Sequence, residues 1–381
     1  MLTAGVAACA AVPPAPAPQP PPQPPRTLFQ PVAFAQLPGW ADDALAEAWP
    51  AFIAGCAALL ARPQTAAIWR EPCDAARSAG SADSRTLRAL FERYLNAYRA
   101  LGPDGATTGL VTGYYEPLLD GSRNRSELHR YPLYAPPDDL LSVELAGLYP
   151  ELEGKRVRGR LEGKRVVPYW SRADIEGGKA AVAGKELVFV DDALEAFLLQ
   201  VQGSGRIRLA EGGTLRVGYA DQNGQPYRSL GRILVERGAL APEEVSLQAI
   251  GAWARQHPRE LPALLDENPS YVFFRELTPD PTALVDGPIG ALGVALAAGR
   301  TIAVDPRSIP LGAPVFIATT WPLSGAPLDR LVFAQDTGGA IRGALRADFF
   351  WGFGDDAARQ AGAMRGQGRM WLLWPKAAAA P

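Results

Sequence analysis

Three aspartates in the C-terminal part of the chain could carry acid–base chemistry. Asp305 lies in AVDPRSIPLG, Asp336 opens DTGGAIRG and Asp348 opens DFFWG. Each stands where an apolar segment ends or begins, which favours partial burial of its carboxyl group. Burial raises the pKa of a carboxyl group, and a nearby negative charge raises it further. A carboxyl group that stays protonated near neutral pH can act as general acid on a glycosidic or acyl leaving group. For any one of the three, a structural aspartate in a turn is the alternative.

The segment Thr112-Gly113-Tyr114-Tyr115 could contact a sugar. Adjacent residues of a strand face opposite sides, so one tyrosine can pack inward while the other presents an aromatic face and a hydroxyl group. Such a face is suited to stacking on a sugar ring. Packing of the tyrosines in the core is the alternative interpretation.

Two further stretches combine glycines with polar side chains. Gly203 and Gly205 flank Ser204, next to Gln202, so the backbone there can approach a ligand closely. The loop over 218–231 adds hydrogen-bonding and aromatic groups, which are Tyr219, Asp221, Asn223, Tyr227, Arg228 and Ser229. Polyhydroxylated ligands fit such a set, and two polar loops with turn glycines are the alternative. Ser204 has no histidine partner in a triad-like arrangement, so we expect no serine nucleophile.

The composition argues against several classes of protein. The 381 residues include 38 basic and 40 acidic side chains, for a formal net charge of −2. This balance argues against a protein that coats nucleic acid, because such binding depends on neutralising phosphates. The two histidines, His129 and His257, lie far apart, so we expect no metal site and no cofactor. The longest apolar stretches fall short of the roughly 20 residues that a membrane-spanning helix needs.

The apolar pattern indicates helices first and strands afterwards. From 40 to 102, apolar residues recur at i, i+3, i+4 and i+7, which predicts scaffold helices. From 107 to about 235 the period approaches two, with one helix over 191–203. A further helix is expected over 241–258, and from 268 strands return with frequent turn signals. The pattern predicts a mainly β protein with N-terminal helices and a small closed barrel.

The three cysteines lead to two separate predictions. VAAC at 6–9 has the form of a lipobox, so Cys9 is a candidate for lipidation, although the usual basic region before it is missing. Residues 12–26 are rich in proline and suit a polyproline II tether, with a chance match and an unstructured tail as the alternative. Cys56 and Cys73 are a candidate disulfide in an oxidising compartment, and two buried free thiols are the alternative.

From about residue 50 to 375, the sequence resembles the membrane-bound lytic murein transglycosylase A family. Seven ordered motifs carry the resemblance: TGYYEP at 112–117, VQGSG at 201–205, GYADQNGQPYRSLG at 218–231, NPSYVFFRE at 268–276, GALGVAL at 290–296, AVDPRSIPLG at 303–312 and DTGGAIRGALRAD at 336–348. The last two resemble the "3D" module, named for its three aspartates.

The resemblance implies a fold and a division of the chain. The aspartate-bearing part is expected to form a double-psi β-barrel, with a second β domain inserted and a groove between the two for a glycan strand. Residues 1–27 would be a truncated signal with its linker. Residues 28–112 and 262–381 would form the barrel domain with its helices, and 113–261 the inserted domain.

The resemblance also implies a reaction. The substrate would be peptidoglycan, cut between N-acetylmuramic acid and N-acetylglucosamine, with the C6 hydroxyl group of muramic acid closing a 1,6-anhydro ring. Asp348 matches the catalytic acid of the family, and Asp336 and Asp305 match its supporting aspartates. The expected contacts with substrate are Thr112, Gly113, Tyr114, Tyr115, Gln202, Gly203, Ser204, Gly205, Tyr219, Tyr227, Arg228, Ser229, Gly338 and Gly339.

The partners and location follow from the same resemblance. Glycan strands of peptidoglycan and other cell-wall enzymes are the expected partners, and nucleic acid is not. The protein would lie at the periplasmic side of the outer membrane of a Gram-negative bacterium, as a lipoprotein anchored through Cys9.

Two other functions stay open. An aspartic protease would use the Asp336-Thr337-Gly338 sequence, but the chain has no second copy to supply the partner carboxyl group. A non-catalytic, expansin-like module could bind the cell wall through a similar small barrel.

Overall fold

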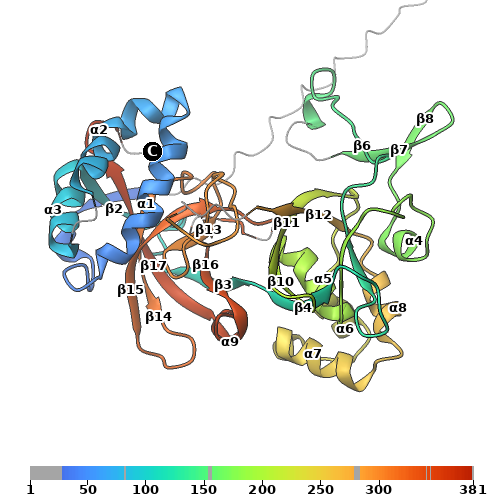
Figure 1. Ribbon diagram of the computed structural model, residues 1–381. Helices are drawn as coiled ribbons and strands as arrows, with labels where there is room; N and C mark the ends of the chain where they lie inside the picture. Colours follow the sequence, from blue (N-terminus) through green and yellow to red (C-terminus); the bar gives the residue numbers. More distant parts are fainter. Residues whose placement is uncertain are drawn as a thin grey trace, which may run out of the picture.

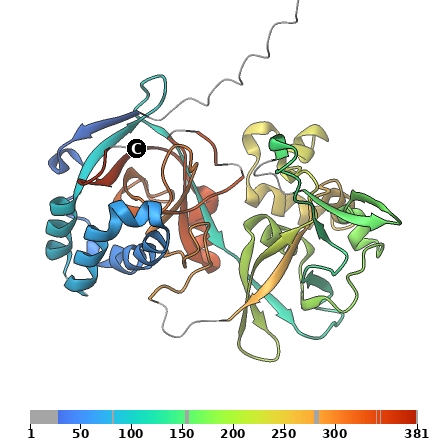
Figure 2. The ribbon, with the colours of Figure 1, turned by 90° about the horizontal axis from the view of Figure 1, so that it is seen from above.

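A computed structural model describes residues 28–80, 83–152, 157–278, 284–339, 341–343 and 345–379. Cys9 and the proline-rich segment lie outside these residues. The described chain folds into two β bodies that lie side by side (Figure 1, Figure 2). It is mainly β with helices near its N-terminal end, which confirms the expected fold class.

The first body contains one sheet of eight strands in the order β1-β2-β17-β14-β15-β13-β16-β3. Their bounds are β1 Leu28–Val32, β2 Leu95–Leu101, β3 Gly109–Glu116, β13 Thr301–Val304, β14 Pro314–Thr320, β15 Pro327–Asp336, β16 Ala347–Phe353 and β17 Arg365–Pro375. Strand β17 also pairs with β3, so six of the eight strands close into a ring. A small closed barrel was expected; its double-psi connectivity stays a prediction.

Helices cover the barrel on the left of Figure 1. They are α1 Leu45–Leu60, α2 Pro63–Ala79 and α3 Ser84–Tyr94, after the short 3-10 turn Phe34–Gln36. Phe52 and Phe91 from these helices pack with Phe316, Phe333 and Trp371 of the barrel in one buried cluster. Burial of large apolar side chains on both elements fixes the helices to the barrel wall.

A disulfide joins the first two helices. Cys56 of α1 and Cys73 of α2 are bonded, as the sequence predicted for the pair. The bond closes a loop of 17 residues. In the chain-entropy view, such a link stabilises the fold by about 3 kcal/mol, because it restricts the unfolded chain.

The helical prediction for the end of the N-terminal region is wrong. The helix α3 begins after Asp83, whose side chain accepts a hydrogen bond from the Thr86 N–H, but it stops at Tyr94. Residues 95–101 form β2 instead, which pairs with β1 on one edge and β17 on the other. Pairing with β1 and β17 gives this segment hydrogen bonds on both of its edges. These tertiary hydrogen bonds outweigh the helical periodicity of its residues.

The second body has a sheet of six strands in the order β12-β11-β10-β4-β9-β5 and a smaller sheet β6-β7-β8. The bounds are β4 Leu118–Ser122, β5 Tyr131–Tyr134, β6 Leu141–Ser142, β7 Arg158–Glu162, β8 Arg165–Pro168, β9 Glu186–Val190, β10 Ser204–Leu209, β11 Thr214–Gln222 and β12 Val272–Leu277. Because β12 pairs with β11, this body extends beyond the boundary expected at residue 261.

Helices of the second body pack around its larger sheet. They are α4 Arg172–Glu176, α5 Ala193–Gln202, α6 Leu230–Glu236, α7 Leu247–Gln256 and α8 Leu261–Asp266, with 3-10 turns at Pro150–Leu152 and Pro242–Glu244. The single helix expected over 241–258 is therefore divided. Ser246 accepts a hydrogen bond from the Ala249 N–H and starts α7 anew. In the part of the chain that the structure describes, no helix is long and apolar enough to cross a membrane.

Candidate active site

The barrel strands bring two aspartates and a threonine to one level. On neighbouring strands, Asp336 of β15 lies opposite Ala303 of β13, Ala303 opposite Asp348 of β16, and Asp348 opposite Thr112 of β3. Neighbouring strands are about 4.8 Å apart, so the backbones of the two aspartates lie roughly 10 Å apart, across one strand. Residues in register on adjacent strands point to the same face, and their side chains can therefore meet.

Asp348 has a polar chain of contacts on one side. The Thr112 hydroxyl group donates to Asp348 Oδ1 at 2.5 Å, and Arg346 Nη2 donates to Thr112 Oγ1 at 2.7 Å. A guanidinium group can only donate, so Arg346 leaves the Thr112 hydrogen directed at the carboxyl group. Burial raises the pKa of Asp348 and the charge of Asp336 adds to this, while the Thr112 hydrogen bond and Arg346 oppose it.

Asp336 accepts hydrogen bonds on both oxygens. Tyr114 donates its hydroxyl group to Oδ2 and the Ala291 N–H donates to Oδ1, each at 3.0 Å. Burial raises the pKa of Asp336, and these donors oppose the rise because they favour the charged form. Burial beside Asp336 also keeps the pKa of Tyr114 well above its usual value. Tyr114 is therefore a permanent donor.

Asp305 has a different environment from the other two aspartates. Its carboxyl group is 2% exposed and accepts from Arg307 Nε at 3.0 Å and Nη2 at 2.7 Å, and from the Gly343 N–H at 3.0 Å. The Arg307 hydrogen bonds hold the pKa of Asp305 well below its usual range. Asp305 is thus ionised, and it holds the segment between Asp336 and Asp348 through Gly343.

The TGYY segment divides between the two faces of β3. Thr112 and Tyr114 face the aspartates, while Gly113 and Tyr115 point away. A Cβ atom at 113 would lie 2.6 Å from Trp351 Nε1, so glycine is needed for packing at that position. Burial is the main cause that raises the pKa of Tyr115 to about 12, with Glu195 of the second body contributing.

The Gln202–Gly205 segment lies beside the end of β3. Gly203 caps α5 with a φ of 84°, and Ser204 opens β10 opposite Gly218. The Arg206 N–H donates to the Pro117 carbonyl oxygen at 2.8 Å, which fixes this strand against the exit from β3. A Cβ atom at Gly203 would lie 3.9 Å from the Tyr219 Cβ atom, so these two expected contacts are neighbours.

Three other expected contacts serve the packing of the second body. Arg228 pairs with Glu236 at 2.9 Å and Glu267 at 3.3 Å, and Ser229 immediately precedes α6. Tyr227, directly before Arg228 in the sequence, is 55% exposed. Asn223, considered with this group, is buried and donates to the backbone oxygens of Trp170 and Pro269. Among the described residues, the hydrogen bonds and ion pairs of Asn223 and Arg228 lie within the second body and do not reach the aspartates.

The two glycines after Asp336 differ in their surroundings. A Cβ atom at Gly338 would lie 2.9 Å from Ile341 Cγ1, whereas nothing lies within 4 Å of one at Gly339. Gly339 is exposed beside the aspartates. It leaves open space there that a ligand could use.

Sequence reasoning missed Arg346 and Arg307. Arg346 stands two residues before Asp348, and residues two apart in an extended segment share a face. Arg307 stands two residues after Asp305. The two-residue spacing between each arginine and its aspartate is the sequence signal that could have identified both arginines. The Ala291 N–H could not be found this way, because a backbone donor from a distant loop leaves no trace in residue types.

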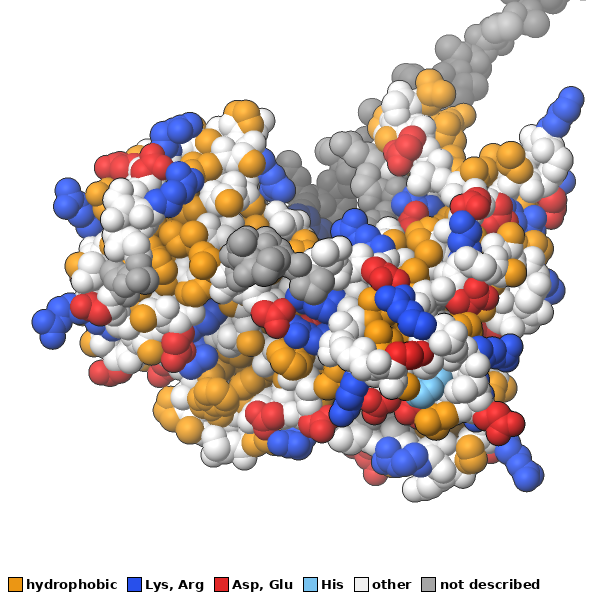
Figure 3. Space-filling view, in the orientation of Figure 1, with side chains coloured by type: hydrophobic (Ala, Val, Ile, Leu, Met, Phe, Trp, Pro, Cys, Tyr) orange, Lys and Arg blue, Asp and Glu red, His pale blue; other side chains and the backbone are white. Residues whose placement is uncertain are grey.

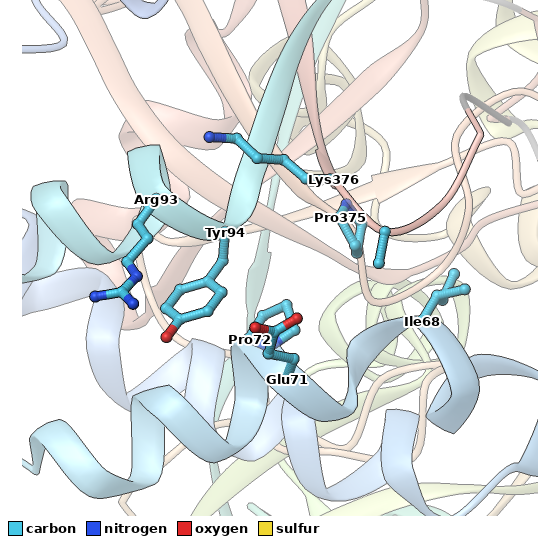
Figure 4. Close-up of a pocket in the computed structure, with 8 residues that line it drawn as sticks. Ile68, Glu71, Pro72, Arg93, Tyr94, Pro375 and Lys376 are labelled. Atoms are coloured by element: carbon cyan, nitrogen blue, oxygen red, sulfur yellow. The ribbon is translucent and has the colours of Figure 1, made fainter.

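Other surfaces of the protein are separate from these residues. A cavity of about 200 Å³ lies between α2, the end of α3 and the end of β17, lined by residues such as Glu71, Tyr94 and Lys376 (Figure 4). No residue of the expected site lines it. Basic and acidic side chains are interspersed over the face seen in Figure 3. Among the described residues, no group of three or more His, Cys, Asp or Glu side chains could hold a metal ion.

Known protein families match both bodies. Residues 110–275 match the family described as the MltA specific insert domain, and residues 300–374 match the 3D domain. Membrane-bound lytic murein transglycosylase A of Escherichia coli K12 is 31% identical over 299 residues, which are 76% of this chain and 72% of that protein. The chain belongs to the membrane-bound lytic murein transglycosylase A family. The resemblance drawn from its motifs is confirmed.

Solved structures of transglycosylase A proteins share the fold of this family member. A crystal structure of MltA from Neisseria gonorrhoeae gives a TM-score of 0.82 at 38% identity, covering 93% of this chain and 94% of that one. A crystal structure of Escherichia coli MltA with bound chitohexaose gives 0.66 at 27% identity, covering 93% and 95%. Both bodies are therefore part of the transglycosylase A fold.

Proposed function

We propose that this protein is a peptidoglycan lytic transglycosylase that cuts the β-1,4 bond between N-acetylmuramic acid and N-acetylglucosamine and leaves a 1,6-anhydro sugar. The partly buried Asp348 carboxyl group, at one level with Thr112 and Asp336, is the observation that carries the proposal. Family membership supports the substrate class, as does the chitohexaose bound to the Escherichia coli relative.

Asp348 serves as the single acid and base of the reaction. Thr112 donates to Oδ1, so Oδ2 carries the acid proton. That proton passes to the glycosidic oxygen as the bond from this oxygen to C1 of muramic acid breaks. The C6 hydroxyl oxygen then bonds to C1, and its proton returns to Asp348. No water is consumed, and the enzyme ends in its starting protonation state.

One carboxyl group is sufficient because the nucleophile belongs to the substrate. Ordinary glycosidases use two carboxyl groups, about 5–5.5 Å apart for retention and about 6.5–9.5 Å for inversion. An attacking group held in the same molecule has a high effective concentration and needs no second carboxylate to activate it.

Asp336 is assigned the charged role in this site. Tyr114 and the Ala291 N–H both donate to it, which favours its ionised form, and its charge helps to keep Asp348 protonated. A negative charge near C1 also stabilises the oxocarbenium-like transition state. Asp305 positions the segment that carries both residues and takes no part in proton transfer.

The glycan lies between the two bodies, along the Thr112 and Tyr114 face of β3. Gln202, Ser204 and Tyr219 contact it from the second body, and the backbone at Gly338 and Gly339 contacts it from the barrel. Only Pro117 separates β3 from β4, and β10 pairs with β4. This pairing supports the arrangement, because it brings the Gln202–Gly205 segment close to the end of β3.

The relatives called membrane-bound support a location at the periplasmic side of the outer membrane. A lipid on Cys9 would supply the anchor, and other cell-wall enzymes are proposed partners. Metabolic labelling with a radioactive fatty acid tests the anchor: wild type should carry label, and Cys9→Ser should not.

Digestion of purified peptidoglycan sacculi tests the function. We expect products lighter by one water than those of hydrolysis, measured by mass spectrometry. Asp348→Asn should bind sacculi and release no product. Products of full hydrolytic mass would overturn the proposal. Binding without cleavage by wild type would favour the expansin-like alternative, and cleaved peptide would favour the protease.

A further inference from the structure

Four charged side chains that the proposed reaction does not use meet where the two bodies join. Arg206 Nε donates to Glu116 Oε2 at 2.8 Å, and Arg206 Nη1 to Asp286 Oδ2 at 3.0 Å. Arg216 Nη1 donates to Asp286 Oδ1 at 2.7 Å. Glu116 is 1% exposed, and Arg206 is also buried. We refer to these four residues as the interbody cluster.

The members of the interbody cluster come from different parts of the fold. Glu116 is the last residue of β3 in the barrel, whereas Arg206 lies in β10 and Arg216 in β11 of the second body. Asp286 lies on the segment that returns from β12 to β13. The outgoing connection starts at Pro117, directly after Glu116, so the cluster stands at the crossing of both connections.

Arg206 also contacts the barrel on a second side. Its guanidinium carbon lies 3.8 Å from the centroid of the Phe353 ring, a cation–π distance. Phe353 stands opposite Glu116 in the pairing of β16 with β3, and it immediately precedes α9 Gly354–Ala363. One side chain of the second body is therefore held between a carboxylate and an aromatic ring of the barrel.

The charges of the interbody cluster balance, two positive against two negative. Removing one partner of a buried ion pair leaves an uncompensated charge in a poorly hydrated place, which is strongly unfavourable. A rotation of one body against the other would separate Arg206 from Glu116 in this way. The contacts therefore oppose any rotation that separates these two side chains.

The interbody cluster lies on the same strand faces as the proposed site. Glu116 is two residues from Tyr114 on β3, and Arg206 is two residues from Ser204 on β10. Residues two apart on a strand share a face and lie about 7 Å apart. Joining Glu116 to Arg206 therefore fixes Ser204 relative to Tyr114.

We propose that Glu116, Arg206, Arg216 and Asp286 are positioning residues that set the angle between the two bodies, and with it the width of the glycan groove. The identity of the ligand as a glycan strand rests on the proposed function. The restraint on the angle does not, because it follows from the contacts of the free protein.

Pulsed electron paramagnetic resonance on the full chain measures that angle without any substrate. Cys56 and Cys73 are bonded, so Cys9→Ser leaves no free thiol. Spin labels at Ser324→Cys, in the barrel turn after β14, and Ala239→Cys, after α6, then report one distance across the bodies. Both positions are exposed. Glu116→Gln is the test variant, and Asp286→Asn is a second one at a side chain that is 67% exposed, where a folding failure is not expected.

Asp43→Asn is the matched control. Asp43 pairs with Arg300 at 2.8 Å, both are buried, and both belong to the barrel body. The same change from carboxylate to amide there should lower the melting temperature and leave the interbody distance as in wild type.

We expect Glu116→Gln to broaden the distance distribution at least twofold, and Asp286→Asn to broaden it less. With glycan strands, Glu116→Gln should raise KM about tenfold and change kcat less than threefold. A distribution as narrow as that of wild type in both variants would overturn the proposal. A broadened distribution in a protein that releases no anhydro product would leave the positioning role intact and reject the proposed function instead.

Discussion

The two oxygens of the Asp348 carboxyl group have different surroundings. Oδ1 accepts from Thr112, whose hydroxyl oxygen is in turn occupied by Arg346. This order fixes which oxygen can hold the acid proton without any rotation of the side chain. Thr112 and Arg346 thus determine which Asp348 oxygen would hold the proposed acid proton, and neither side chain exchanges a proton itself.

Thr112→Val should move the pH dependence of the reaction. The hydrogen bond that this substitution removes favours the carboxylate form of Asp348, so the pKa of Asp348 should rise further when the bond is lost. Because the proposed acid must start protonated, the alkaline limb of the kcat profile should shift to higher pH by about one to two pH units, as expected for the loss of a charged hydrogen bond of about 1.5–3 kcal/mol. Muropeptide release measured over pH checks this. Thr319→Val, which removes a barrel hydroxyl group bonded to the Gln367 oxygen, should leave the limb in place.

Asp305→Asn should change stability in a pH-dependent way. The pKa of Asp305 is lower in the folded protein than in the unfolded chain, where it is about 3.9. Its stabilisation is therefore complete above about pH 4 and is lost as pH falls through the folded pKa. We expect the variant to lose about 2 kcal/mol at pH 7 and progressively less below about pH 4. Urea unfolding of wild type and variant at pH 7 and at a pH below about 4 measures this. An equal loss of unfolding free energy at the two pH values contradicts it.

Sequence reasoning located the three carboxyl groups but treated them as one set. Apolar segments beside all three aspartates predicted partial burial: Asp336 and Asp348 are partly buried, and Asp305 is only 2% exposed. Asp305 differs because Arg307 and the Gly343 N–H surround it. Such partners depend on how chain segments turn, which residue types alone do not specify.

Among the elements, β3 connects the chemistry with the fold. Its one face carries Thr112 and Tyr114, and its other face packs against Trp351 and α9 through Gly113. The strand cannot move away from α9 without moving the groups that contact the aspartates.

Gly113→Ala should disturb that packing. The added Cβ atom would lie 2.6 Å from Trp351 Nε1 and 2.9 Å from Ala361 Cα, and the second of these is backbone that cannot turn aside. Overpacking of this kind costs about 1–3 kcal/mol, and the shift of β3 should reduce kcat. Calorimetry and product release measure the two effects. Gly147→Ala, where nothing lies within 4 Å, should change neither; an equally stable Gly113→Ala would contradict the packing argument.

The disulfide between α1 and α2 should matter for stability and little for chemistry. Replacing Cys56 and Cys73 together with serine should remove about 3 kcal/mol from the free energy of unfolding. At low temperature, the rate of product release should stay within twofold, because neither helix supplies a side chain to the site. Denaturant unfolding with and without a reducing agent checks the first point. An unchanged midpoint would contradict it.

Element prediction from the sequence worked where local pattern and tertiary pairing agree. The strands that carry Asp336 and Asp348 come from short apolar segments and lie where they were expected. Residues 95–101 continue a helical pattern, yet they pair with two strands. Those partners stand near the two ends of the chain, so no local window could include them.

At the scale of the whole molecule, the chain passes between the two bodies twice, at Pro117 and on the return from β12 to β13. The sequence pattern predicted a closed barrel, and the family resemblance implied an inserted β domain that ends at residue 261. Strand β12 lies beyond residue 261, and its pairing with β11 assigns it to the larger sheet of the second body. The interbody cluster joins Glu116 and Arg206, which are 90 positions apart, and pairs Asp286 with Arg206 and Arg216, which precede it by 80 and 70 positions.

The hydrogen bond between Thr112 and Asp348 spans 236 positions of the sequence, and β17, the last strand to be synthesised, closes the ring around it. A polypeptide that lacks β17 therefore cannot close the ring of strands that holds the proposed acid Asp348. An incomplete chain of this protein, which we propose cuts the peptidoglycan of its own cell, would therefore lack the assembled active site and could not damage the wall.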